Sequence, residues 1–232
     1  MLFLFDVDGT LTPSRGMINQ RFKRYLMEEM SNPFVLVTGS DPDKTREQIG
    51  DDLYDSTTVY NCCGNHVFSS GVEIYRSNWQ MPKTLESFLT GALEGSTFAH
   101  KTGRHLEHRI GLCNFSIVGR NANQDQRKEY FFWDQIWKER INLVNQINRG
   151  WPDVEASVAG ETGTDIYMRG AGKEQVLDQV KHLAPLRFFG DKMDPAGNDY
   201  ALAEAIRSSK LGVCYHVKDW MDTWETLRGM GA

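Results

Sequence analysis

The sequence lacks any apolar run long enough to cross a membrane, since a transmembrane helix needs about 20 consecutive apolar residues. The apolar start at residues 2–5 is short and has no basic flank, so it does not resemble a signal peptide. We therefore expect no membrane association and a cytoplasmic location.

Cysteine is also scarce, with four residues in 232. Cys62 and Cys63 are adjacent, and no CxxC pair occurs. This excludes a disulfide scaffold and a zinc site built on paired cysteines, and it predicts reduced thiols in a cytoplasmic protein. The histidines at 100, 105 and 108 do not have the spacing of a helical HExxH zinc site either.

The charge balance has no strong bias, because 26 Lys and Arg residues face 31 Asp and Glu residues, for a net charge of −5. Such a chain has no general attraction to nucleic acid or to anionic membranes. With 40% hydrophobic and 25% charged residues it is an ordinary globular protein. The composition therefore favours a folded protein that acts on a small molecule.

Apolar runs at 2–7, 33–37, 186–191 and 211–217 have the continuous character of buried parallel strands. Helical patterns at 18–30, 41–49 and 172–183 alternate with them. This order predicts an α/β fold with a parallel sheet and helices on both faces. Residues 66–75 predict a hairpin that turns at Ser70-Gly71.

The middle of the chain has a different pattern. Residues 82–93 predict a helix, 104–118 and two short runs at 154–158 and 164–168 predict antiparallel strands, and 124–148 predict one long helix. We therefore expect an inserted α+β domain at 78–170. The remaining ranges, 1–77 and 171–232, would form the α/β core.

Acidic residues follow two of the predicted strands, Asp6 after the first and Asp191 after the run at 186–190. In a parallel sheet, ligands gather at the carboxyl ends of strands. If these strands are neighbours, Asp6, Asp8, Asp191 and Asp199 converge there. Crowded carboxylates favour a hard cation such as Mg²⁺ with room for phosphate oxygens. Thr38 and Lys173 would add a hydroxyl donor and an ammonium to the same site.

Four segments in this order resemble the motifs of the haloacid dehalogenase superfamily: DVDGT at 6–10, TGSD at 38–41, Lys173 and GDKMDPAGND at 190–199. The resemblance implies a haloacid dehalogenase-like core with an inserted cap. It also implies that Asp6 is the nucleophile that becomes an aspartyl-phosphate and that Asp8 is the general acid and base. Residues two apart in an extended strand point to the same side, which would place Asp8 above Asp6. Asp8 would also bind the metal through its backbone carbonyl.

A narrower resemblance covers nearly the whole chain and points to the eukaryotic phosphomannomutases. DVDGTLTPSR, EHRIGLCNFSIVGRNANQDQR and FFGDKMDPAGND carry it. It implies that the phosphate of a hexose phosphate, or the sugar itself, is bound by Arg15, Arg109, Arg120, Arg127, Gly163 and Asp165. Gly163 departs from the family pattern, because the family has a serine there; a hydroxyl contact to the substrate is missing.

The resemblance implies a mutase that interconverts mannose 6-phosphate and mannose 1-phosphate, and glucose phosphates as well, with Mg²⁺ and a hexose 1,6-bisphosphate activator. It also implies a homodimer formed through the cap. One alternative is a sugar-phosphate phosphatase on the same scaffold, in which water replaces the sugar hydroxyl as acceptor. Another is a non-catalytic binding protein, against which the intact Asp6, Asp8, Lys173 and Asp191 argue.

Overall fold

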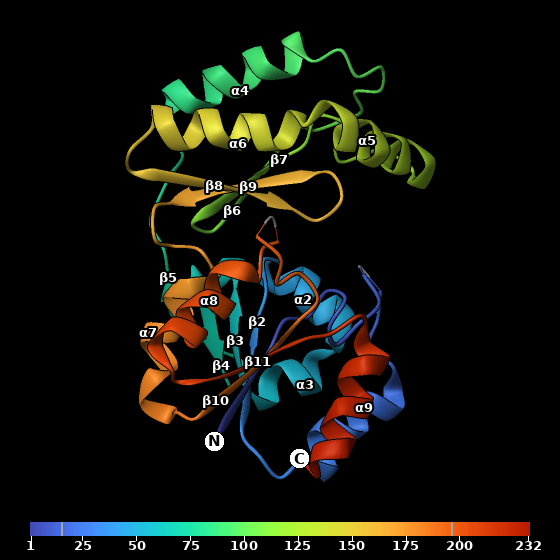
Figure 1. Ribbon diagram of the computed structural model, residues 1–232, viewed down its shortest axis with the longest axis vertical. Helices are drawn as coiled ribbons and strands as arrows, with labels where there is room; N and C mark the ends of the chain where they lie inside the picture. Colours follow the sequence, from blue (N-terminus) through green and yellow to red (C-terminus); the bar gives the residue numbers. More distant parts are fainter. Residues whose placement is uncertain (15, 196) are drawn as a thin grey trace. The chain divides into compact units, whose positions relative to one another are not determined.

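The computed structural model describes residues 1–14, 16–195 and 197–232, and the described chain divides into two compact units. The larger unit consists of Met1–Ser77, Lys173–Pro195 and Asp199–Ala232. The other, which we call the inserted unit, consists of Asn78–Gly172 with residues 197 and 198. Each unit has a sheet of its own (Figure 1).

The larger unit is built on a seven-stranded sheet in the order β11-β10-β1-β2-β3-β4-β5. The first five strands in that order run parallel and the last two pair antiparallel. Their bounds are β1 Leu2–Phe5, β2 Phe34–Val37, β3 Thr58–Asn61, β4 His66–Ser69, β5 Val72–Arg76, β10 Leu186–Gly190 and β11 Gly212–His216. The β4–β5 hairpin turns at Ser70-Gly71, both with positive φ, as the sequence predicted.

Alternate side chains of the central strand enter two different cores, because a strand has a period of two. Phe3 and Phe5 pack in one core and Leu2 and Leu4 in the other. The first core is closed by residues of α1 Gln20–Arg24, the π-helical turn Tyr25–Glu29, α3 Asp51–Ser56 and α9 Trp220–Met230. The second is closed by α7 Val176–Val180 and α8 Tyr200–Ser209, so helices cover both faces of the sheet, as predicted (Figure 1).

The inserted unit has a four-stranded antiparallel sheet in the order β6-β7-β9-β8. Its strands are β6 Leu106–Arg109, β7 Leu112–Phe115, β8 Val154–Ala159 and β9 Gly163–Met168. One face packs against α4 Lys83–Gly95, α5 Gln124–Trp137 and α6 Glu139–Gly150 through Phe115, Ala156 and Ile166 (Figure 1). The register places Glu107, Asn114 and Asp165 side by side in a polar row on the other face.

The prediction of one helix over 124–148 was wrong, because α5 and α6 are separate. Lys138 between them adopts a left-handed conformation with φ 56°. The buried Asp134 side chain accepts hydrogen bonds from the backbone N–H and from Nε of Arg140, at 2.8 Å each. Arg140 also donates to the carbonyl of Gly160 on the β8–β9 turn. These tertiary contacts stabilise a break that the helical periodicity alone does not reveal.

Candidate active site

Asp6 and Asp191 follow directly after β1 and β10, which are parallel neighbours with Phe5 opposite Phe189. Together with Asp199, which precedes α8, they offer carboxylate oxygens that lie within 4.8 Å of one another. The condition for a shared site, that these two strands are neighbours, is therefore met. The strands that follow β1 in the sequence, β2 and β3, lie on one side of it, and β10 and β11 lie on the other side. The cluster is therefore at a topological switch point of the sheet.

Lys173 joins two members of this cluster. Its Nζ donates to Asp6 Oδ1 at 2.5 Å and to Asp199 Oδ1 at 2.7 Å, and its side chain is fully buried. Burial alone would lower the pKa of Lys173, but Asp199 and Asp6 outweigh it and hold the pKa above its usual value. Lys173 is therefore a permanent positive charge beside the predicted nucleophile.

Negative charge still exceeds what this lysine compensates. Burial and the nearby Asp199 raise the pKa of Asp6, against the opposing effect of Lys173. Burial also raises the pKa of Asp191, although Lys192 Nζ donates to its Oδ2 at 2.7 Å. Further positive charge at this point would favour the ionised form of both carboxyls.

The donor set fits a divalent cation at Asp6 and Asp191. Asp191 Oδ1 is buried and has no hydrogen-bond partner among the described residues, which leaves an oxygen available to a metal. Asp199 fits this role less well, because its Oδ1 accepts from Lys173 and its Oδ2 accepts from the backbone N–H of Lys192. Its contacts assign it to the orientation of Lys173 instead.

Two glycines allow the cluster to close. Gly9 has φ +86°, and a Cβ there would come within 2.4 Å of Asp191 Oδ2. A Cβ on Gly190 would come within 2.7 Å of Asp199 Oδ2. Both distances are shorter than any real Cβ contact, so a larger residue at either position would displace a carboxylate of the site.

Asp8 has different partners from Asp6, and the group of carboxylates within 4.8 Å consists of Asp6, Asp191 and Asp199 without it. Strand β1 ends at Phe5, so the two-residue period of a strand does not extend to Asp8. Its Oδ1 accepts from Gln48 Nε2 of α2 (Pro42–Ile49) at 2.8 Å, and its Oδ2 lies 3.5 Å from Ser40 Oγ. Gln48 is 1% exposed, and sequence reasoning missed it, since a polar residue in a helix carries no pattern that separates it from a surface glutamine.

Thr38, at the end of β2, is buried and accepts the backbone N–H of Ser40 at its Oγ1, 3.1 Å away. Its carbonyl accepts the backbone N–H of Cys63. The hydroxyl that donates to the Asp6 carboxylate is that of Thr10, whose Oγ1 lies 3.3 Å from Asp6 Oδ2. All four cysteines are free thiols, as expected.

The polar face of the inserted sheet brings Arg109 and Arg120 together through one residue, Glu107. Its Oε1 accepts from Arg109 Nε at 2.7 Å, and its Oε2 pairs with Arg120 Nε at 2.5 Å. Arg127, at the start of α5, lies 3.8 Å from the carboxylate of Glu161 on the β8–β9 turn. Glu107 was not among the predicted site residues, although its position two residues before Arg109 in a strand is a signal that was available.

Asn114 lies beside both Asp165 and Gly163 on this face. Asn114 Nδ2 donates to Asp165 Oδ1 at 2.7 Å, and its Oδ1 accepts from Arg120 Nη1 at 3.1 Å. A Cβ on Gly163 would come within 2.6 Å of Asn114 Nδ2, so the carboxamide fills the space beside this glycine. Gly163 can therefore contribute only backbone atoms. Arg15 lies outside the described residues.

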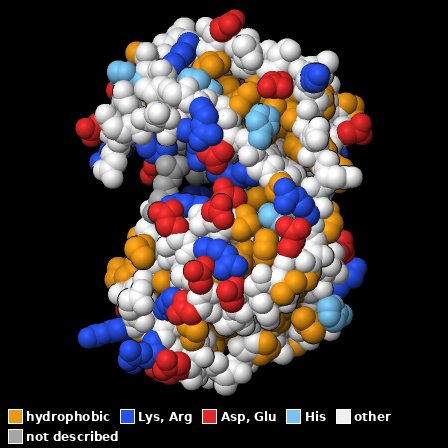
Figure 2. All heavy atoms as spheres, turned by 180° about the vertical axis from the view of Figure 1, so that it is seen from behind, with side chains coloured by type: hydrophobic (Ala, Val, Ile, Leu, Met, Phe, Trp, Pro, Cys, Tyr) orange, Lys and Arg blue, Asp and Glu red, His pale blue; other side chains and the backbone are white. Residues whose placement is uncertain are grey.

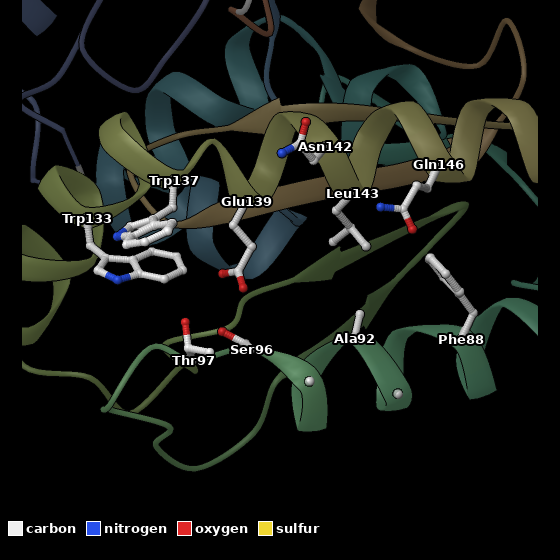
Figure 3. Close-up of a pocket in the computed structure, with 12 residues that line it drawn as sticks. Phe88, Ala92, Ser96, Thr97, Trp133, Trp137, Glu139, Asn142, Leu143 and Gln146 are labelled. Carbon is white, nitrogen blue, oxygen red and sulfur yellow. The ribbon is translucent and has the colours of Figure 1, made fainter.

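A pocket of about 590 Å³ lies between α4 and the α5–α6 pair, lined among others by Phe88, Trp133, Trp137 and Glu139 (Figure 3). It contains none of the predicted site residues. On the face shown in Figure 2, acidic side chains are interspersed with lysine and arginine, without a continuous basic surface. None of the helices in the described ranges combines the length and the apolar character needed to cross a bilayer.

Solved structures resemble this fold at low sequence identity. The C-terminal domain of a trehalose-6-phosphate phosphatase of C. albicans superposes with a TM-score of 0.70 at 15% identity, over 99% of this chain and 91% of that chain. A haloacid dehalogenase-like hydrolase from Bacteroides thetaiotaomicron gives 0.57 at 12% identity, over 99% and 98%. The fold is therefore that of the haloacid dehalogenase-like proteins, as the sequence predicted.

Relatives with closer sequences share one name. A phosphomannomutase of Galdieria sulphuraria is 31% identical over 217 residues, which cover 89% of this chain and 86% of the relative. The phosphomannomutase of Saccharomyces cerevisiae (strain ATCC 204508 / S288c) is 30% identical over 213 residues, covering 87% and 84%. The model of the family described as eukaryotic phosphomannomutase matches residues 22–230. This chain belongs to the eukaryotic phosphomannomutase family.

Proposed function

We propose that this protein interconverts mannose 6-phosphate and mannose 1-phosphate, and accepts glucose phosphates, through an aspartyl-phosphate on Asp6 and a hexose 1,6-bisphosphate. The observation that carries the proposal is the buried contact of Asp6 with Lys173 at the carboxyl end of the central strand, in a member of this family. A buried carboxylate held by one ammonium is a nucleophile of fixed orientation.

In the first half-reaction, Asp6 Oδ attacks the phosphorus of the bisphosphate, and the bond from phosphorus to the sugar oxygen breaks. Asp8 gives its proton to that leaving oxygen. In the second half-reaction, a hexose monophosphate presents its unphosphorylated C1 or C6 hydroxyl, and Asp8 takes the proton of that hydroxyl. The hydroxyl oxygen attacks the phosphorus of the aspartyl-phosphate, which re-forms the bisphosphate and regenerates the Asp6 carboxylate. Gln48 would hold the Asp8 carboxyl in place, since its amide donates to Asp8 Oδ1 at 2.8 Å.

Mg²⁺ is the cation that these oxygen ligands suit, and Asp6, Asp191 and the backbone carbonyl of Asp8 would hold it, with Asp199 near. When bound, it supplies positive charge that polarises the phosphoryl oxygens. Lys173 has a separate role. Its ammonium offsets the negative charges of Asp6 and Asp199, and its hydrogen bond to Asp6 orients the carboxylate that attacks.

The second phosphate of the bisphosphate would bind at arginines of the inserted unit. Arg109, Arg120 and Arg127 present guanidinium groups, which fit phosphate oxygens bidentately. Arg15, Asp165 and the backbone at Gly163 would complete the contacts to the sugar phosphate. A cytoplasmic homodimer formed through the inserted unit is part of the same proposal and rests on the family resemblance.

The test measures two activities on the same preparations. A coupled assay follows mannose 1-phosphate with a catalytic amount of glucose 1,6-bisphosphate, and a second assay follows phosphate release from p-nitrophenyl phosphate. A chelator should abolish both. Arg120→Ala and Arg127→Ala should lower mutase kcat/KM by about tenfold to a hundredfold, the usual cost of one charge-assisted contact, while hydrolysis of the small ester changes little.

The outcome separates the proposal from a phosphatase. Gly163 has no hydroxyl for the substrate, which is the observation that favours hydrolysis as the alternative. Phosphate release from mannose 6-phosphate without isomerisation would establish a sugar-phosphate phosphatase. An equal loss of both activities in the arginine variants would show that these arginines support the fold, and that the proposed second phosphate subsite is wrong.

A further inference from the structure

One carboxylate on the polar face of the inserted sheet contacts two arginines at once. Glu107 and Arg109 are two residues apart in β6, so their side chains emerge on the same face. Glu107 Oε1 accepts from Arg109 Nε at 2.7 Å, and Glu107 Oε2 pairs with Arg120 Nε at 2.5 Å. The three side chains are only 13–19% exposed. Each oxygen of Glu107 therefore has its own guanidinium.

The second arginine is held from another direction as well. Asn114 lies opposite Glu107 on β7, and its Oδ1 accepts from Arg120 Nη1 at 3.1 Å. Asn114 is 5% exposed and is itself fixed by its hydrogen bond to Asp165 Oδ1 at 2.7 Å. The contacts form one continuous network from Arg109 through Glu107, Arg120 and Asn114 to Asp165.

The charge state of Glu107 makes these contacts strong. Burial would raise its pKa, but Arg109 and Arg120 outweigh burial and hold the pKa below its usual value. Glu107 is therefore ionised at neutral pH. Two guanidiniums that contact the same carboxylate are close enough to repel each other, and the negative charge of the carboxylate between them offsets that repulsion.

We propose that Glu107 is a positioning residue, which fixes Arg109 and Arg120 in the arrangement that receives a phosphate anion. The inference rests on the proposed function, in which these arginines bind the second phosphate. Long side chains lose rotamer freedom when they bind a ligand, and this loss weakens binding. In this chain Glu107 and Asn114 already order the guanidiniums in the folded protein, so the cost falls on folding.

An opposing effect makes the proposal testable. The negative charge of Glu107 also repels a phosphate, so a residue that only balanced charge would weaken anion binding by its presence. Removal of its charge would then tighten binding. The positioning role predicts the opposite, because a misplaced guanidinium loses the bidentate geometry that phosphate requires.

Two variants separate charge from reach. Glu107→Gln keeps the shape and removes the charge, and Glu107→Asp keeps the charge but is one methylene shorter, so it cannot contact both guanidiniums at these distances. The dissociation constant of mannose 6-phosphate, and of inorganic phosphate as a simpler probe, is measured by calorimetry on the full chain. We expect both variants to raise it about tenfold for mannose 6-phosphate, which corresponds to the loss of about 1.4 kcal/mol.

Glu129→Gln is the matched control. Glu129 lies on α5, its side chain is 57% exposed, and it pairs with His100 outside the arginine network. Its replacement removes the same charge from the same unit and should leave the dissociation constant unchanged. A cooperative unfolding transition in guanidinium chloride shows for each variant that it is folded.

Tighter binding in Glu107→Gln with unchanged binding in Glu107→Asp would overturn the proposal and make Glu107 a simple counter-charge. Failure of the parent protein to bind mannose 6-phosphate would overturn it too. The proposed function can fail separately: a parent that binds mannose 6-phosphate without isomerising it is not a mutase, and the binding comparison of the variants still decides the role of Glu107.

Discussion

Replacement of Lys173 by methionine is the perturbation whose consequence follows most directly from the structure. Lys173 is fully buried and donates to both Asp6 and Asp199. Methionine has an unbranched side chain of similar size, so Lys173→Met removes the charge and leaves little empty volume. Two buried carboxylates then lose their shared cation.

The expected loss of stability is large. Removal of one partner from a buried ion pair typically costs about 3–5 kcal/mol, because the remaining charge is buried and uncompensated. Whole domains are stable by only about 5–15 kcal/mol. The variant should therefore unfold at a much lower denaturant concentration than the parent when a chelator is present. Bound Mg²⁺ would replace part of the missing positive charge, so added Mg²⁺ should stabilise Lys173→Met more than it stabilises the parent.

The assay is equilibrium unfolding by guanidinium chloride, with and without Mg²⁺. Lys181→Met is the control, because Lys181 is 57% exposed and pairs with Asp178 on the surface, where such pairs contribute only about 0–1 kcal/mol. A Lys173→Met protein within about 1 kcal/mol of the parent in chelator would refute the reasoning, since the cluster would then not depend on this lysine.

Two further predictions address the nucleophile and the inserted unit. Asp6→Asn should fold but form no phosphoryl-enzyme with glucose 1,6-bisphosphate in a mass measurement of the intact protein, because an amide is a poor nucleophile; a phosphorylated variant would exclude Asp6. Arg140→Leu should destabilise the chain by about 3–5 kcal/mol in thermal or denaturant unfolding, because Asp134, which is 8% exposed, loses the partner at 2.8 Å. A change below about 1 kcal/mol would show that this pair does not stabilise the break between α5 and α6.

The strands and the strand-end acids of the larger unit were predictable from local patterns. Continuous apolar runs identify buried strands, and an acid placed directly after such a run must lie near the carboxyl edge of the sheet. This put Asp6 and Asp191 at the carboxyl edge, where they share a site only if their strands are neighbours. The structure supplies that pairing, because β1 and β10 are adjacent although the two aspartates are 185 residues apart. The hairpin at Ser70-Gly71 was readable for a similar reason, because turn chemistry is local.

Helix continuity was less predictable. Residues 124–148 have a helical period throughout, yet the chain breaks at Lys138, which is held by contacts of Asp134 and Arg140. A periodic pattern indicates which residues face a core, and it does not indicate a break that is stabilised by a residue from another part of the chain. Gly160, on the β8–β9 turn, is that residue here.

The sequence by itself determined which chemistry this chain can carry, because aspartates after buried strands, a lysine and spaced arginines are readable one at a time. Only the tertiary structure decided how their charges are shared: Lys173 between Asp6 and Asp199, Gln48 on Asp8, and Glu107 between Arg109 and Arg120. The physical reason is that a hydrogen bond depends on separations of about 3 Å, whereas the partners here are joined across up to 167 positions of the chain. Local patterns determine which residues lie at the end of a strand. The packing of whole helices and strands determines which of these side chains come within hydrogen-bond distance of one another.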